Sequence, residues 1–105
     1  MTIKGTLHSC YGMIKDKGKM GAVFHMMDKV REEHNELEVA WYSYQKEPTG
    51  KNRQKMGEEA VDAINSLITL LDALAHTEGC PEGFTEDCIN LVSSKLHARG
   101  YYRDF

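Results

Sequence analysis

The longest helical pattern in the chain runs from Met20 to Gln45 and reads MGAVFHMMDKVREEHNELEVAWYSYQ. Apolar side chains recur along it every three or four residues, which is the spacing of one face of an α-helix. No proline interrupts it over about seven turns. The residues on this face are Val23, Met26, Val30, His34, Leu37, Trp41 and Tyr44. This stretch predicts a long amphipathic helix and favours a helical fold.

Three further stretches carry helical spacing, namely Thr6–Lys15, Arg53–Thr77 and Thr85–Arg99. The two prolines, Pro48 and Pro81, lie in polar or glycine-containing connections, where helices are expected to end. Four helices with short connections predict an all-α fold, with an antiparallel four-helix-bundle-like arrangement.

The third and fourth stretches are also expected to turn apolar faces inward. For the third, the face comprises Met56, Ala60, Ile64, Leu67, Leu71 and Leu74. For the fourth, it comprises Cys88, Leu91, Val92 and Leu96. The third helix has further apolar residues around its sides and is therefore expected to be central.

The composition is that of one small globular domain over residues 1–105, with 41% hydrophobic and 28% charged residues. The net charge of −3 gives no overall attraction to a nucleic acid polymer. No run of about 18 apolar residues is present, so we expect no contact with a membrane. A core this thin favours a second subunit, and we expect a homodimer or homotetramer.

The start of the chain lacks the apolar run of a signal peptide. The three cysteines are an odd number without a CxxC pair, which favours reduced thiols and a cytoplasmic protein.

Two acidic pairs are the strongest candidates for a functional site. Glu33 and Glu36 lie three residues apart in one predicted helix, and Glu59 and Asp62 lie three residues apart in the next. This spacing places each pair on one helical face, where the two like charges repel unless a cation lies between them.

The surroundings of these pairs also indicate a site for a cation. Glu33 lies in an otherwise uncharged row of its helix, and Glu59 lies in a narrow polar band that runs along a helix otherwise rich in apolar residues. The members of the band are Glu58, Glu59, Asp62, Asn65, Ser66 and Thr69. Burial of such a band is unfavourable without polar partners. Carboxylate oxygens suit Mg²⁺, with Mn²⁺ as a second choice, and Mg²⁺ keeps water molecules that a phosphate can replace.

Other interpretations of the charged and metal-binding residues remain. Either acidic pair alone is commonly a solvated helix face. A zinc site could be drawn from Cys80, Cys88 and His97, although their spacing fits no usual zinc pattern. A di-iron site would need a Glu-x-x-His motif on two helices, which these helices lack.

The ordered set of motifs resembles the MazG-like, all-α nucleoside triphosphate pyrophosphohydrolase superfamily. The stretch Arg31–Trp41, which carries EExxE, is similar to the first acidic helix of that family, and Glu58–Ile64, which carries EExxD, is similar to the second. The stretch Lys95–Tyr102 is similar to its closing Lys…Arg-x-Tyr segment, and Ile14–Gly18 resembles the Lys-Gly end of its first helix. Ala60 is smaller than the residue usual there, which leaves substrate choice and helix packing open.

The resemblance implies a hydrolase that cleaves a nucleoside triphosphate between its α and β phosphates and gives a monophosphate and pyrophosphate. Glu33, Glu36, Glu59 and Asp62 would hold Mg²⁺, which would help to ionise the attacking water. Glu36 is the candidate general base.

The same resemblance suggests residues that bind the substrate. Lys95 and Arg99 would offset phosphate charge, with Tyr102 beside them, although solvated basic residues at a helix end are an equally good interpretation. Asn65 could bind the sugar or the water shell of the metal, or it could be a buried amide without a function. Trp41 and Tyr44 could stack on a base, but at helical spacing they more often belong to a core or a subunit interface.

A different class of function is a catalytically silent helical bundle that senses nucleotides or binds another protein, because a fold does not determine an activity. The preferred base and sugar are not determined by these motifs.

Overall fold

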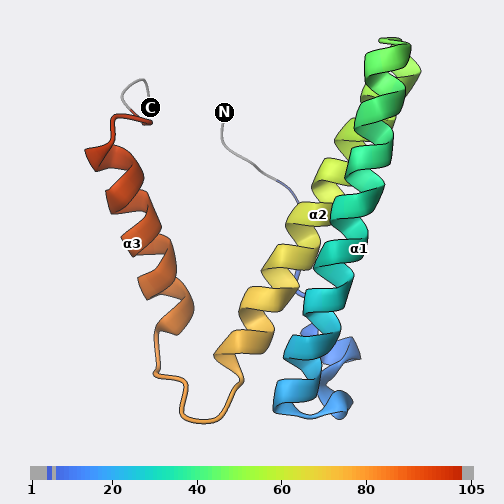
Figure 1. The fold of residues 1–105 in the computed structure, drawn as a ribbon. Coiled ribbons are helices and arrows are strands. Elements are labelled where there is room, and N and C mark those ends of the chain that lie inside the picture. Colours follow the sequence, from blue (N-terminus) through green and yellow to red (C-terminus); the bar gives the residue numbers. More distant parts are fainter. Residues whose placement is uncertain (1–4, 6, 103–105) are drawn as a thin grey trace.

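The computed structural model describes residues 5 and 7–102, and over this part of the chain it is helical, without a β-strand. This part of the chain contains three α-helices preceded by two short 3-10 turns, and Figure 1 shows their arrangement. The elements are η1 (Tyr11–Met13), η2 (Lys15–Lys17), α1 (Lys19–Lys46), α2 (Gly50–Ala75) and α3 (Phe84–Ala98). The predicted all-α class is confirmed, and three of the predicted helices begin and end within three residues of their expected bounds. Among the described helices, none is both long and apolar enough to cross a membrane.

Helices α1 and α2 form an antiparallel hairpin, closed by a short connection that contains Pro48. The Thr49 side chain caps α2 by accepting a hydrogen bond from the backbone N–H of Asn52 at 3.2 Å. The Asn52 amide in turn donates to the carbonyl of Glu47 at 2.9 Å, at the end of α1. These local bonds determine where one helix ends and the next begins, so the two acidic stretches lie opposite each other.

The predicted helix Thr6–Lys15 is wrong. Residues 7–18, which we call the strap, contain two 3-10 turns and cross the α1–α2 pair; Thr6 lies outside the described residues. The strap is held by hydrogen bonds to α2, because the backbone N–H of Cys10 donates to Thr69 Oγ1 at 3.0 Å and Ser9 Oγ donates to Asp72 Oδ2 at 2.5 Å. Tyr11 stacks on His76 with ring centroids 4.1 Å apart. These tertiary contacts take the place of helical hydrogen bonds, and the spacing of apolar residues does not reveal them.

Helix α3 diverges from the α1–α2 pair after it leaves the end of α2 (Figure 1). The expectation that its apolar face is buried is wrong for the single chain, since Leu91 is 72% exposed and Val92 is 48% exposed, and no residue of α3 is buried. With three α-helices in its described part, the chain by itself does not confirm the expected four-helix bundle.

The core is thin. Its buried apolar residues are Ile14, Ala22, Met26, Ala40 and Ala73, three of which are alanines. The radius of gyration is 16.3 Å, whereas a compact chain of this length has about 13 Å. The single chain is therefore extended, and several of its apolar faces lack a cover.

Candidate metal centre

The polar band of α2 faces α1. Among the buried residues of α2 are Glu59, Ser66 and Thr69, and Glu33 is buried opposite them on α1. By contrast Leu67, which was expected to face inward, is 51% exposed. The small residues Ala22 and Ala40 of α1 and Ala73 of α2 are also buried. The packing of this hairpin therefore encloses carboxylates, and the larger apolar face of α2 remains partly uncovered.

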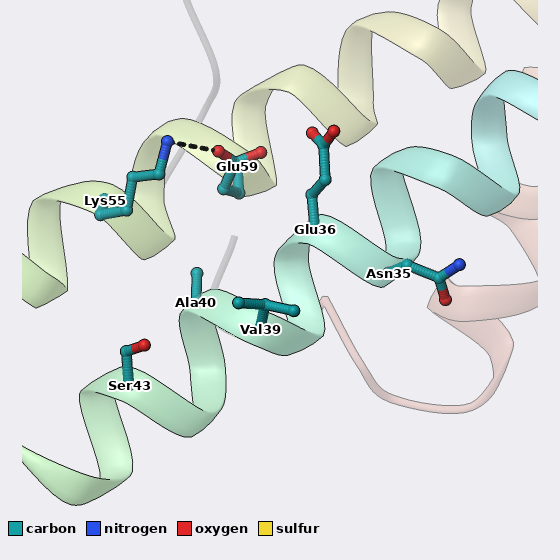
Figure 2. Close-up of a pocket in the computed structure, with 7 residues that line it drawn as sticks. All are labelled: Asn35, Glu36, Val39, Ala40, Ser43, Lys55 and Glu59. Carbon is teal, nitrogen blue, oxygen red and sulfur yellow. Dashed lines mark ion pairs between the residues drawn. The ribbon is translucent and has the colours of Figure 1, made fainter.

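Three carboxylates converge between the two helices. One oxygen atom from each of Glu33, Glu59 and Asp62 can be chosen so that all three lie within 4.8 Å of one another. Within the described part of the chain this is the one group of three or more His, Cys, Asp or Glu residues close enough to share a metal ion. Glu36, the fourth predicted ligand, extends from α1 toward α2 beside Glu59 (Figure 2). Three of the four predicted acidic ligands are therefore brought together, Glu36 lies outside this group of three, and Cys80, Cys88 and His97 form no such group among the described residues.

Each of the two buried carboxylates, Glu33 and Glu59, has one oxygen paired with a lysine and one oxygen without a partner among the described residues. Lys29 Nζ lies 3.3 Å from Glu33 Oε1, and Lys55 Nζ lies 2.7 Å from Glu59 Oε1. The second oxygen of each carboxylate, Oε2, is buried without a hydrogen-bond partner in the described structure. Glu33 and Glu59 have only 7% and 6% of their surfaces exposed, so water satisfies these atoms poorly. An unpaired buried polar atom costs about 1–3 kcal/mol, and more if it is charged, so this arrangement favours a bound cation.

The two lysines were not identified from the sequence, although a simple signal was present. Each stands four residues before the buried carboxylate of its own helix, which gives Lys-x-x-x-Glu-x-x-Glu from Lys29 and Lys-x-x-x-Glu-x-x-Asp from Lys55. A spacing of four residues places a lysine next to a carboxylate on a helix. Because α1 and α2 are antiparallel, the repeated pattern brings the two sets together from opposite directions.

The charges shift the pKa values of two carboxyl groups in opposite directions. Repulsion by Glu33, followed by desolvation and repulsion by Glu59, raises the pKa of Glu36 above its ordinary value of 4.5. The hydrogen bond from Lys55 is the main reason that the pKa of Glu59 is lowered. The ionised form is therefore favoured at Glu59, and Glu36 has the higher affinity for a proton.

Cavities lie on both sides of the carboxylate cluster. The first, which we call the hairpin cavity, has a volume of about 500 Å³ and contains Glu36, Lys55 and Glu59 (Figure 2). Its other lining residues are Asn35, Val39, Ala40 and Ser43. The second, which we call the strap cavity, has a volume of about 230 Å³ and contains Glu33, Asp62 and Asn65. Its other lining residues are Cys10, Met13, Ile14, His25, Met26, Lys29, Ser66 and Thr69. A ligand bound at the carboxylates can therefore extend in either direction.

The remaining predicted substrate-binding residues are distributed unevenly. Asn65 lies at the site, whereas Lys95, Arg99 and Tyr102 line neither cavity and belong to α3 or to the residues that follow it. Figure 1 shows that the end of α3 lies far from the α1–α2 pair. One chain therefore does not bring these basic residues to its own carboxylates.

The aromatic candidates are also separate from the acidic cluster. Trp41 is exposed and lines a third, apolar cavity together with Leu37, Glu38 and Met56, whereas Tyr44 is half-buried. Trp41 is therefore not a core residue of the single chain.

No protein-family model matches the chain, and comparisons with curated proteins and with solved structures likewise find no match.

Proposed function

We propose that the chain is a Mg²⁺-dependent nucleoside triphosphate pyrophosphohydrolase that releases a nucleoside monophosphate and pyrophosphate. The observation that carries the proposal is the pair of buried, unpartnered oxygens, Glu33 Oε2 and Glu59 Oε2, within a cluster of acidic side chains. The order of the acidic motifs and their resemblance to MazG-like enzymes support the choice of a nucleotide as substrate.

Glu33, Glu59 and Asp62 fit a hard divalent cation, because all three supply oxygen ligands and one of them, Asp62, is open to solvent. Glu36 extends toward α2 beside Glu59 (Figure 2), and in this proposal it contacts a water molecule of the ion. When bound, Mg²⁺ or Mn²⁺ would supply positive charge for phosphate oxygens and would lower the pKa of a water ligand.

Glu36 serves as the general base in this proposal. The raised pKa of its carboxyl group increases its affinity for a proton. The oxygen of the attacking water forms a bond to the α phosphorus, and the bond from this phosphorus to the α–β bridging oxygen breaks. The proton passes to Glu36, and the electron pair leaves with pyrophosphate.

The direct test is pyrophosphate release from a panel of ribonucleoside and deoxyribonucleoside triphosphates, with and without Mg²⁺. We expect Glu59→Gln and Asp62→Asn to abolish turnover while circular dichroism shows an intact helical fold. Glu38→Gln is the matched control, since Glu38 is an exposed glutamate of α1 that pairs with His34. Full activity of both site variants would contradict the proposal.

Binding of the ion can be measured without turnover. Mg²⁺ should raise the melting temperature of the wild type progressively with concentration, because it binds the folded chain preferentially. The rise should disappear in Glu59→Gln and persist in Glu38→Gln. An equal rise in all three proteins would indicate a general salt effect.

A nucleotide sensor is the second candidate, favoured by the position of Lys95 and Arg99 away from the cluster in a single chain. A sensor would bind nucleotide with Mg²⁺ by calorimetry and release no pyrophosphate from any member of the panel.

The proposal includes a homodimer or homotetramer. The extended chain, the alanine-rich core and the exposed apolar side chains of α2 and α3 all favour a second copy that covers these faces. In such an assembly four or more helices could pack as a bundle, and α3 of one chain could bring Lys95 and Arg99 to the acidic cluster of its partner.

A further inference from the structure

The strap cavity is bounded on three sides by different parts of the chain. The strap contributes Cys10, Met13 and Ile14, α1 contributes Met26, and α2 contributes Asn65. One end of the cavity reaches the carboxylates through Glu33 and Asp62. A group held here would therefore be attached directly to whatever binds at the acidic cluster.

The lining of the cavity is divided by chemistry. Met13, Ile14 and Met26 supply apolar and polarisable surface, which suits the face of an aromatic ring. Asn65 and Ser66 supply polar atoms on the α2 side. The volume of about 230 Å³ is below the 300 Å³ or more of a cavity for a drug-sized molecule, so it suits one ring system and not a complete nucleotide.

Hydrogen bonding within the cavity leaves Asn65 available. The Thr69 hydroxyl is used in both directions, since it accepts from the N–H of Cys10 at 3.0 Å and donates to the carbonyl of Asn65 at 3.1 Å. Ser66 Oγ donates to the carbonyl of Ala63 at 2.7 Å. Within the described part of the chain, the Asn65 amide makes one weak contact, from Nδ2 to Cys10 Sγ at 3.7 Å. Its Oδ1 and its second N–H can therefore pair with a polar edge.

We infer that the strap cavity binds the nucleobase of the substrate, with Asn65 pairing to the edge of the base, an inference that rests on the proposed function. The base lies between the methionine and isoleucine side chains and α2. The sugar leads out past Asp62, and the phosphates lie at the carboxylates and toward the hairpin cavity, where Lys55 is located. Asn65 is thus a specificity-determining residue, and the strap forms one wall of the base pocket.

Cys10 offers a test that does not depend on turnover, because its exposed thiol lines the strap cavity, whereas Cys80 and Cys88 lie outside it. The wild-type protein is treated with N-ethylmaleimide in the presence of Mg²⁺, and modification of each cysteine is followed by peptide mass spectrometry. The probes are inorganic pyrophosphate and the nucleoside monophosphates of the common bases, each in its ribose and its deoxyribose form. We expect at least one monophosphate to slow modification of Cys10 but not of Cys80 or Cys88, and we expect pyrophosphate not to do so.

Substitution of Asn65 tests the pairing itself. Asn65→Leu, which has a similar size, should abolish the protection of Cys10 and raise KM for the preferred triphosphate about tenfold, the loss expected for one hydrogen bond in a closed site. Asn90→Leu is the matched control, since Asn90 is an exposed asparagine of α3. Circular dichroism checks the fold, and Asn65→Ala replaces the leucine variant if that variant is unfolded.

Three results would overturn the inference, two of which concern the protection of Cys10 by different probes and the Asn65 variants. One is equal protection of Cys10 by pyrophosphate and by monophosphates, and the other is unchanged base preference and protection in both Asn65 variants. A wild type that releases pyrophosphate while no monophosphate protects Cys10 would also overturn it. Absence of pyrophosphate release from every triphosphate would instead contradict the proposed function, on which the base pocket depends.

Discussion

At the residue scale, the main feature of the site is that its lysines neutralise the buried carboxylates only in part. Each buried glutamate has one oxygen paired with a lysine from the preceding helical turn and one oxygen without a partner. Asp62 and Glu36 add negative charge from more exposed positions. The metal-free chain therefore contains more carboxylate charge than its own lysines neutralise, and this excess is what a divalent cation would compensate.

Replacement of Glu36 by glutamine should abolish turnover and hold or raise the melting temperature of the metal-free protein, because repulsion of Glu33 and Glu59 is removed. The pKa of Glu36 is raised in the folded chain, so its ionised carboxylate destabilises the fold. This destabilisation is absent at a pH below the ordinary pKa and reaches its full size only above the raised pKa. The difference in melting temperature between Glu36→Gln and wild type should thus be close to zero at about pH 4 and largest near neutral pH. A variant that melts earlier than wild type at neutral pH would identify Glu36 as a structural residue.

Loss of Lys55 should have the opposite effect on the metal-free protein. Lys55→Met leaves Glu59 buried without its ion pair, which lowers the melting temperature by a few degrees. Added Mg²⁺ should recover most of this loss, since it supplies the missing positive charge. Lys51→Met is the control at an exposed position of the same helix, and a similar loss there would exclude a specific role for the Lys55–Glu59 pair.

At the scale of elements, the strap has only the few backbone hydrogen bonds of its two 3-10 turns and lacks the continuous hydrogen bonding of an α-helix. Its attachment depends on polar contacts with α2, in particular those of Cys10 and Ser9 with Thr69 and Asp72. Since the strap forms one wall of the strap cavity, the same contacts determine whether that cavity exists.

Thr69→Val should therefore weaken the attachment of the strap to α2, while the valine side chain keeps nearly the same shape as threonine. Thr69 is buried, so the N–H of Cys10 loses its acceptor, at a cost of about 1–2 kcal/mol in the free energy of unfolding. Hydrogen exchange at Cys10 and its neighbours should accelerate, whereas exchange in the α1–α2 connection should not change. Thr77→Val is the control, because Thr77 follows α2 and its hydroxyl donates to the carbonyl of Leu74 and not to the strap.

At the scale of the whole molecule, the hairpin encloses two carboxylates and a few small or apolar residues, and it leaves larger apolar side chains such as Leu67 exposed. The chain is more extended than a compact domain of its length, and α3 contacts little besides the end of α2. The second copy that we propose would bury these surfaces and enlarge the thin core of the single chain.

Sedimentation should show a species of two or four times the chain mass of 11.9 kDa. Leu67→Lys introduces a charge on the exposed apolar face of α2 and should shift the protein toward monomer, with a large loss of thermal stability. Gln54→Lys, at an exposed polar position of the same helix, should leave the assembly unchanged. A wild type that sediments as a stable monomer would contradict the oligomer.

Helical periodicity was enough to predict α1, α2 and α3, because each is long and its apolar spacing is a local property of the chain. The i, i+3 spacing of the acidic pairs and the polar band of α2 likewise predicted Glu33, Glu59 and Asp62, which converge, but the same spacing also included Glu36, which lies outside the group of three. The strap was not predictable, since its conformation comes from hydrogen bonds to residues about 60 positions away, such as that from Cys10 to Thr69. The position of α3 was also decided only by tertiary structure. Its apolar face shows that it needs a partner, but local spacing does not specify whether that partner is its own chain or another.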